Sequence, residues 1–315
     1  MGSAAEVPGA DPFGTAGLRR RVLDAWAASS ARFREDANAE EELALGGYRD
    51  RLVVELAQNA ADAAARGGVP GRLRLTLRDG VLAAANTGAA LDASGVESLS
   101  TLRASSKRED GRTAVGRFGV GFAAVLAVCD EPAVLGTPGG VRWSLAEARD
   151  LARAAAEESG TPGLDEELRR RDGHVPLLRL PLPAEGTPPE GYDTVVVLPL
   201  RDAAAEDLTR RLLDEIDDAL LLTLTGLAEI TVETDGAVRT LTRRTLEATG
   251  PGPATVVVTD SAAAEDSRWQ LTGASGRLDD ALLADRPTEE RRRPYWSVTW
   301  AVPVDADDRP QRPRT

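Results

Sequence analysis

Three short segments of this chain contain residue types that could bind a nucleotide and activate a water molecule. In the first, Glu55, Asn59 and Asp62 are spaced at i, i+4 and i+7, so on a helix their side chains share one face. A carboxylate at Glu55 can orient and deprotonate water, and the amide oxygen of Asn59 can complete a Mg²⁺ shell made mostly of phosphate and water. Taken alone, the segment fits equally well a solvent-exposed face with i,i+4 ion pairs.

The second segment, Asn86-Thr87-Gly88, follows an expected strand. A polar side chain at the end of a buried strand, followed by glycine, suits a position that contacts a base and lets the backbone approach it closely. The alternative, which this segment alone favours, is an ordinary Asn-Thr-Gly turn.

The third segment begins an apolar run with glycines. Backbone N–H groups at the start of a helix can face an anion, where the helix N-terminus adds positive potential. A dinucleotide-binding motif would need a strand directly before the glycines, but a polar stretch over 100–113 stands there, and the Gly-Lys-Ser/Thr of a Walker loop is absent. The segment consists of Gly116, Arg117, Phe118, Gly119, Val120, Gly121 and Phe122.

The composition limits the function classes. A net charge of −13 argues against a general nucleic-acid binder, because such proteins present a basic face. No apolar run approaches the roughly 20 residues that span a bilayer, and 1–11 lacks a signal-peptide pattern, so a soluble cytoplasmic protein is expected. The single cysteine, Cys129, is expected to be a small buried side chain. Lys107 is the only lysine among 38 basic residues, and it lies between the second and third segments.

Hydrophobic periodicity and turn residues predict the elements that position these segments. Helices are expected over 18–33, 48–66, 119–128, 146–171 with a break near 160–163, and 203–223. An acidic break is expected over 35–42 and a mobile polar loop over 92–114. Strands are expected over 73–78, 81–85, 134–137, 141–145, 175–180, 194–200, 229–234, 237–242, 254–259, 269–272 and 296–302.

The order of these elements predicts an α+β fold, a two-layer sandwich of helices on one face of a mostly antiparallel sheet. Three parts are expected along the chain. Residues 1–17 form a flexible N-terminus, 18–245 form the main domain, and 246–315 form a β-rich extension that begins a following domain.

The ordered set of segments resembles the GHKL ATPases, which include gyrase-type topoisomerases, mismatch-repair MutL, histidine kinases and the ninety-kilodalton heat-shock chaperones. Within this superfamily, the motifs are most similar to the chaperone branch, and especially to the N-terminal domain of sacsin-like proteins. The resemblance covers roughly 20–235. This resemblance implies the Bergerat ATP-binding fold over 18–245, with a lid at 92–115. The residues that carry it are Glu55-x-x-x-Asn59-x-x-Asp62-Ala63, Ser105-Ser106-Lys107, Gly-Arg-Phe-Gly-Val-Gly-Phe over 116–122, and the strand that starts Tyr192-Asp193-Thr194.

The resemblance implies ATP and Mg²⁺ as ligands and gives the first segment its roles. Glu55 would be the general base, Asn59 the Mg²⁺ ligand, and Asp62 a support for the pocket. A slow ATPase of this kind couples hydrolysis to lid closure and serves a chaperone-like role on client proteins.

The resemblance also implies which residues contact the nucleotide. Gly88 would lie under the adenine, Thr194 would join the water network around the base, Lys107 would contact the phosphates from the lid, and the glycines of 116–122 would cradle them. Asn86 departs from the wider family, in which an aspartate accepts the adenine N6 amine. An asparagine carbonyl can also accept this bond, but its NH₂ could donate to a guanine O6. Sacsin-like proteins are similar in having asparagine here, which favours ATP.

Other functions remain as alternatives. Related families receive a catalytic cation from a second domain, which nothing in this chain clearly supplies. A missing domain or dimerisation is therefore expected to provide it, and hydrolysis by this chain alone is expected to be weak. The first alternative is a non-hydrolysing nucleotide-sensing or protein-interaction module. A histidine kinase is disfavoured because the only histidine, His174, lies in an expected turn, and a MutL-like role is disfavoured by the acidic balance.

Overall fold

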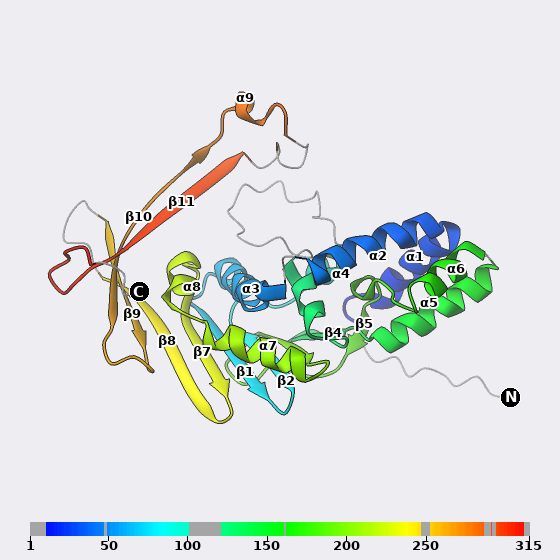
Figure 1. The fold of residues 1–315 in the computed structure, drawn as a ribbon, viewed down its shortest axis with the longest axis horizontal. Helices are drawn as coiled ribbons and strands as arrows, with labels where there is room; N and C mark the ends of the chain where they lie inside the picture. The colour runs from blue at the N-terminus through cyan, green and yellow to red at the C-terminus, as the bar shows by residue number, and fades with distance from the viewer. Residues whose placement is uncertain are drawn as a thin grey trace.

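A sheet of 11 strands runs through the described structure (Figure 1). The computed structural model describes residues 11–46, 49–100, 121–160, 162–246, 253–286, 291 and 294–311. The strands are β1 Gly71–Arg78, β2 Val81–Asn86, β3 Ala133–Gly136, β4 Gly139–Arg142, β5 Leu182–Ala184, β6 Thr194–Pro199, β7 Leu227–Thr234, β8 Ala237–Thr245, β9 Ala254–Asp260, β10 Ser267–Arg277 and β11 Tyr295–Pro303.

The strand order is β11-β10-β9-β8-β7-β1-β2-β6-β3-β4-β5. Neighbouring strands are antiparallel except for β1 and β7, which are parallel. The coarse prediction of helices with a mostly antiparallel sheet is therefore confirmed. Strands β9 to β11, which lie in the predicted extension 246–315, continue the same sheet through the pairing of β8 with β9.

The helices are α1 Thr15–Ala28, α2 Ser30–Leu45, α3 Leu52–Gly67, α4 Ala93–Ser100, α5 Leu145–Ser159, α6 Pro162–Arg170, α7 Ala203–Asp214, α8 Asp218–Thr223 and α9 Asp280–Leu283, with 3₁₀ turns η1 Arg49–Arg51, η2 Gly121–Ala127 and η3 Leu177–Arg179. Helix α3 packs on β1, β2 and β7, while α1, α2, α5 and α6 gather beyond the β5 end of the sheet (Figure 1). None of the helices in the described part of the chain has both the length and the hydropathy to cross a bilayer.

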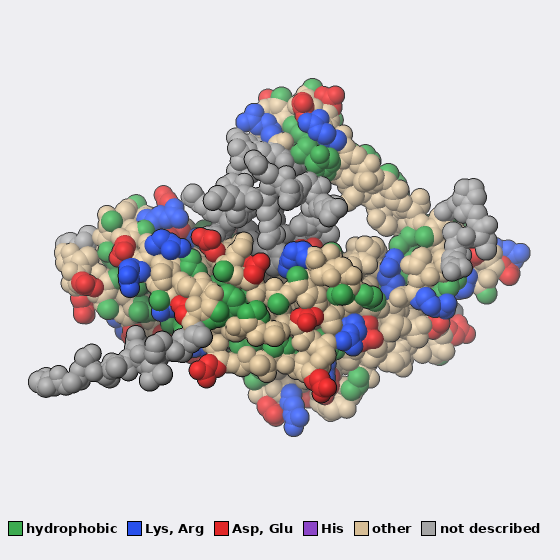
Figure 2. Space-filling model, turned by 180° about the vertical axis from the view of Figure 1, so that it is seen from behind, with side chains coloured by type: hydrophobic (Ala, Val, Ile, Leu, Met, Phe, Trp, Pro, Cys, Tyr) green, Lys and Arg blue, Asp and Glu red, His purple; other side chains and the backbone are tan. Residues whose placement is uncertain are grey.

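Strand β1 shows why α3 covers one face of the sheet. Its residues alternate, with Leu73, Leu75 and Leu77 buried and Arg72 and Arg78 exposed on the opposite face. Because successive strand side chains point to opposite faces, the leucines form the layer under α3. Acidic and basic side chains are interspersed over the molecular face shown in Figure 2.

Several local predictions are confirmed. Helix α3 ends at Gly67, and Gly68 caps it in the left-handed conformation. The hairpin of β1 and β2 turns at Asp79 and Gly80, both with positive φ, as expected of an Asp-Gly turn. The predicted break between helices near 160–163 separates α5 from α6.

Other local predictions are wrong. The expected acidic break over 35–42 lies inside α2, and the helix expected over 18–33 is divided at Ser29, whose φ of −153° is extended. The part of the expected loop 92–114 that is described is helical over Ala93–Ser100 in α4. Of the N-terminal segment 1–17, residues 1–10 lie outside the described residues, and α1 begins at Thr15. The strand expected over 175–180 contains the 3₁₀ turn η3 instead, and the helix expected over 203–223 is divided into α7 and α8.

A buried polar cluster joins α1, α2, η3 and the end of α4. Asp36 accepts hydrogen bonds from Trp26 Nε1 and Arg179 Nη2, both at 3.0 Å, and Arg179 Nη1 donates to the carbonyl of Ser100 at 3.1 Å. Asp36 and Arg179 are each about 5% exposed, so their charges are paired in a region from which water is largely excluded. The cluster fixes the position of α2 against η3 and the end of α4, while the alanine, glutamate and leucine residues of α2 favour the helix itself.

Glu40 lies one turn further along α2 and holds η3 in place. Its carboxylate accepts the backbone N–H groups of Leu177 at 2.5 Å and Leu178 at 3.0 Å. Burial raises the pKa of Glu40 from an ordinary 4.5 to about 7, while the two N–H groups and Arg179 oppose this rise and Asp36 adds to it.

The raised pKa of Glu40 predicts a pH-dependent stability. Between pH 4.5 and about 7 the folded chain keeps a proton that the unfolded chain has released, so the free energy of unfolding falls as pH rises through this window. The loss is on the order of 3 kcal/mol. We expect Glu40→Gln to remove this component in urea titrations at several pH values. The control Glu42→Gln, an exposed carboxylate on the same helix, should leave it intact, and equal pH profiles for the two variants would contradict the assignment.

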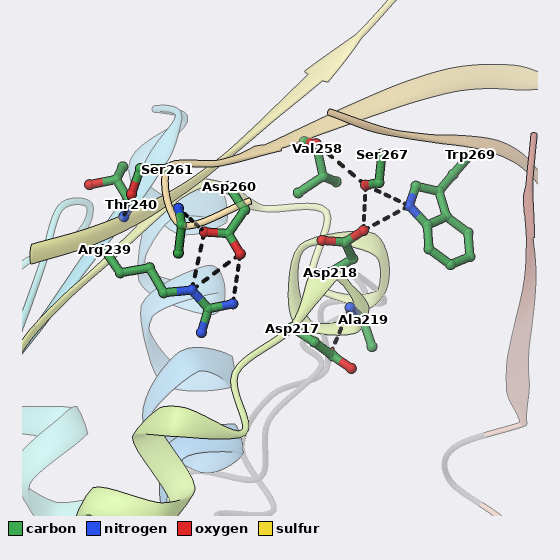
Figure 3. Close-up of polar contacts among 11 residues, drawn as sticks. Asp217, Asp218, Ala219, Arg239, Thr240, Val258, Asp260, Ser261, Ser267 and Trp269 are labelled. Atoms are coloured by element: carbon green, nitrogen blue, oxygen red, sulfur yellow. Dashed lines mark hydrogen bonds and ion pairs between the residues drawn. The ribbon is translucent and has the colours of Figure 1, made fainter. Parts of the chain in front are cut away.

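Polar contacts also fix the base of the long β10–β11 hairpin to the rest of the sheet (Figure 3). Asp218, at the start of α8, accepts hydrogen bonds from Ser267 Oγ and from Trp269 Nε1, the latter at 2.9 Å. Arg239 on β8 forms a two-pronged ion pair with Asp260 on β9, with Nη2 to Oδ2 at 2.7 Å. These contacts tie β9 and β10 to α8 and β8.

Candidate functional site

Helix α3 places the three polar residues of the first segment on one face. Glu55 and Asp62 are buried, at 7% and 5% exposure, and Asn59 between them is partly exposed. Burial raises the pKa of the Glu55 carboxyl, and the charge of Arg51, whose Nε lies 3.7 Å from Oε1, opposes this rise. A carboxylate in such surroundings is more basic than an exposed one, which suits a proton acceptor.

The alanines and glycines around α3 form a seam of very close backbone contacts. A Cβ added at Gly71 would lie 2.8 Å from Ala64 Cβ, and one at Gly226 would lie 2.8 Å from the carbonyl oxygen of Ala61. Side chains are absent or minimal on both sides of the seam, so the helix backbone lies almost directly on the strands and loops below it. This seam sets how close α3 lies to β1 and β7.

The second segment is held against α3 through Gly88. Gly88 has a φ of +129°, and a Cβ there would overlap the backbone carbonyl group of Ala63. The next residue, Ala89, donates its N–H to that carbonyl at 2.8 Å, while the N–H of Gly88 donates to Asp193 Oδ2 at 2.8 Å. The approach of the Gly88 backbone to a base stays a prediction, and in the described structure the segment that Gly88 contacts closely is α3.

Asn86 and Thr194 are direct neighbours across β2 and β6. They form a cross-strand pair, and both are buried on the sheet face that also carries Leu82 and Leu198. Asn86 Nδ2 donates to the carbonyl of Thr87 at 3.2 Å. The structure thus brings together two residues that the sequence analysis assigned to the contact with a base.

The third segment contacts the first through Gly121. A Cβ added at Gly121 would overlap the carboxylate of Glu55, so this glycine packs directly on the predicted base. Phe122 is buried and its ring lies 5.5 Å from that of Trp143, which anchors the start of η2 in the core. The helix expected over 119–128 is a 3₁₀ turn over Gly121–Ala127 in the described residues.

The remaining predicted site residues lie outside the described part of the chain. They are Lys107, Gly116, Arg117, Phe118, Gly119 and Val120. Of the predicted site residues that are described, Glu55 and Gly121 are in contact, Asn86 and Thr194 are paired, and Gly88 packs on the backbone of α3.

Asp193 was not selected from the sequence, although it links the second segment to β6. Its carboxylate receives the N–H of Gly88, and its own N–H donates to the carbonyl of Asn86 at 3.0 Å. The preceding loop is held by Arg72, which donates to the carbonyl of Gly191 at 2.7 Å and lies 5.3 Å above the ring of Tyr192. The sequence feature that could have indicated this role is the position of Asp193 directly before the apolar strand β6.

In the described residues, neither a cluster of metal ligands nor one of the two best-formed surface hollows lies at this site. Among the described residues, no group of three or more His, Cys, Asp or Glu side chains is placed to hold a metal ion. Two surface hollows of about 320 and 420 Å³ lie elsewhere, one lined by α5 and α6 residues such as Arg153 and Asp165, the other beside the turns at Asp79 and Asp235. Neither hollow adjoins the polar face of α3.

No model of a protein family matches this chain, and no curated protein sequence does so either.

The contact at Gly88 predicts an unusually costly glycine substitution. Gly88→Ala should destabilise the fold by on the order of 3 kcal/mol or more, because the new Cβ adds an overlap with α3 to the strain of a positive φ. Gly80→Ala is the matched control, since Gly80 also has a positive φ but has open space around it, and it should cost about 1 kcal/mol. Urea denaturation of both variants measures the difference. Equal losses would mean that the α3 contact does not constrain the site.

Proposed function

We propose that this chain binds ATP with Mg²⁺ on the polar face of α3 and hydrolyses it slowly, as the ATP-binding domain of a chaperone-like ATPase. The fold in this proposal is the Bergerat type of two-layer sandwich, with 92–115 as the lid. One observation carries the proposal: α3 contacts both other segments, through Gly88 on the Ala63 backbone and through Gly121 on Glu55. Two segments that are tens of residues away from α3 in the sequence thus both pack on this helix.

The base in this proposal is adenine, which the similarity to sacsin-like proteins at Asn86 favours. Asn86 Nδ2 donates one of its two N–H groups to the carbonyl of Thr87, so the acceptor Oδ1 and one further N–H remain to meet a base. An acceptor matches the N6 amine of adenine, whereas the O6 of guanine requires a donor. Thr194, paired with Asn86 across the sheet, adds a hydroxyl at the same place.

The donors along α3 fit a nucleotide-bound Mg²⁺ better than a metal held by protein alone. Asn59, partly exposed, offers one neutral oxygen, and a magnesium ion that takes phosphate and water as its other ligands needs few protein atoms. When bound, Mg²⁺ would neutralise charge that develops on the phosphates. Glu55 would hold and deprotonate the attacking water, a role that the raised pKa of its carboxyl favours.

The absence of a side chain at Gly121 would set the position of the Glu55 carboxylate, the proposed general base. Because Gly121 lies directly on the carboxylate of Glu55, a side chain at 121 would displace the base. Asp62, also buried on α3, would support the pocket wall below the nucleotide. In this proposal the predicted phosphate contacts from Lys107 and from the glycines over 116–120 complete the site.

Nucleotide binding can be tested with variants matched along α3. We expect calorimetric titration to detect ATP in the presence of Mg²⁺, with GTP binding more weakly. Asn59→Ala should weaken ATP binding in Mg²⁺ by about tenfold and have less effect in EDTA, since it removes a metal ligand. Val54→Ala, which shortens a partly exposed side chain of α3 about 100° around the helix from Glu55, should bind as the unaltered chain does. The absence of heat with ATP, ADP and GTP alike would refute the proposal.

Hydrolysis distinguishes an ATPase from a nucleotide sensor. Phosphate release by this chain alone should be slow, because no catalytic cation from a second domain was found in the sequence. Glu55→Gln should keep ATP affinity within about threefold while reducing the rate by on the order of a hundredfold or more. Binding with the same residual rate in both proteins would favour the non-hydrolysing sensor, and fast turnover that Glu55→Gln abolishes would show that no added cation is needed.

A further inference from the structure

The edge strand β11 is the largest apolar feature exposed by the described residues. Tyr295, Trp296, Val298, Trp300 and Val302 are exposed by between 36% and 66% of their surfaces. β11 lies at the end of the strand order and contains no charged residue over its nine positions. An edge strand that lacks charges, bulges and an internal proline is open to pairing with another strand.

The hairpin has little support beyond its base. β10 pairs with β9 only over Ser267–Leu271, so the outer halves of β10 and β11 form a two-stranded arm (Figure 1). Figure 2 shows this arm extending from the body, with charged side chains gathered at its tip. A two-stranded ribbon alone is marginally stable in water, and further strands stabilise it.

The free edge of β11 is defined by its pairing with β10. The N–H of Val304 donates to the carbonyl of Arg268, and the carbonyl of Pro294 accepts the N–H of Leu278. The even-numbered residues of β11 therefore direct their backbone N–H and C=O groups toward β10. In an antiparallel pair the alternate residues direct theirs away. The backbone groups of Thr299 and the other odd-numbered residues of β11 therefore face outward.

We propose that β11 pairs antiparallel with β11 of a second copy, about a two-fold axis at Thr299. This register is the one that pairs the whole strand, Tyr295 with Pro303 of the other copy. It also makes the outward-facing residues the hydrogen-bonded pairs, as an antiparallel ladder requires. A two-fold axis makes the contact self-complementary and closed, so it produces a dimer and no fibre.

The same register joins the apolar side chains in favourable pairs. Trp296 of one copy lies across from Val302 of the other, and Val298 across from Trp300, all on one face of the ribbon. Aromatic and β-branched side chains are among the most stabilising cross-strand pairs. Tyr and Trp are also the residues that dominate protein–protein binding energy.

Charges at the two ends of β11 are complementary in this register. Arginine stands at 291–293 before the strand, and an antiparallel partner brings this end toward the end that aspartates follow in the other copy, twice by symmetry. The acidic residues Asp305, Asp307 and Asp308 follow the strand, whereas arginine precedes it. A second copy of this chain therefore matches the edge in both apolar character and charge.

The area involved indicates a weak dimer. A fully covered aromatic side chain buries roughly 150–250 Å², so the exposed parts of this strand in two copies would bury on the order of 1,000 Å², at the lower limit of specific interfaces. The dimer should thus depend on concentration.

Sedimentation equilibrium of the full chain, over concentrations up to its solubility limit, tests the proposal. We expect a monomer–dimer equilibrium whose dissociation constant rises at least about tenfold in Thr299→Pro, which removes the central outward N–H without affecting a bond to β10. Thr299→Lys should act similarly, since it places two like charges together at the axis. Ser275→Lys, which adds the same charge on the opposite edge of the ribbon, should dimerise as the unaltered chain does.

Cysteine cross-linking tests the register. Thr299→Cys should form a disulfide-linked dimer on mild oxidation, because the two substituted positions meet at the axis, and the chain's own Cys129 is buried. Ser275→Cys should not cross-link. A monomer at every concentration, dimerisation unaffected by both Thr299→Pro and Thr299→Lys, or equal cross-linking at 275 and 299 would each overturn the proposal, the last two in favour of another interface.

Discussion

The close contact between the backbone of α3 and the strands beneath it is the constraint on which the candidate site depends. Gly71, Gly88 and Gly226 have no Cβ where one would collide with α3, and alanine occupies the facing positions of the helix. The two layers therefore approach more closely than larger side chains permit. Helix α3 is consequently held against the sheet, and Gly88, two residues after the end of β2, lies on its backbone.

The sequence was sufficient to predict local structure where neighbouring residues alone determine the backbone conformation. Gly68 after α3 and the Asp79–Gly80 turn have positive φ, so their positions could be predicted from residue type. Turn η3 could not, because it is set by contacts with α2 over more than a hundred residues. The helix over 35–42 was missed although its alanine, glutamate and leucine residues favour one. Glu40 satisfies N–H groups of Leu177 and Leu178, and Asp36 neutralises Arg179. The apolar stretch over 175–180 thereby contains a 3₁₀ turn in place of the predicted strand.

The candidate site shows the same division. The helical spacing of Glu55, Asn59 and Asp62 predicted a shared face, and α3 has it. The contact of Gly121 with the Glu55 carboxylate and the role of Asp193 could not be read from spacing, since both depend on how distant segments dock. The alanines of α3 looked like a feature of composition in the sequence. In the structure they face glycines and so allow the close contact between the helix and the strands.

The projection of the arm resolves a conflict between charge and association. With a net charge of −13, two copies of the chain repel each other at short range. In an antiparallel β11 pair the base of each arm meets the tip of the other, so the two bases are separated by the length of nine residues, about 30 Å. That distance exceeds the Debye length of about 8 Å at physiological ionic strength, so salt screens the repulsion between the bodies. The uncharged strand can then pair without bringing two acidic surfaces together.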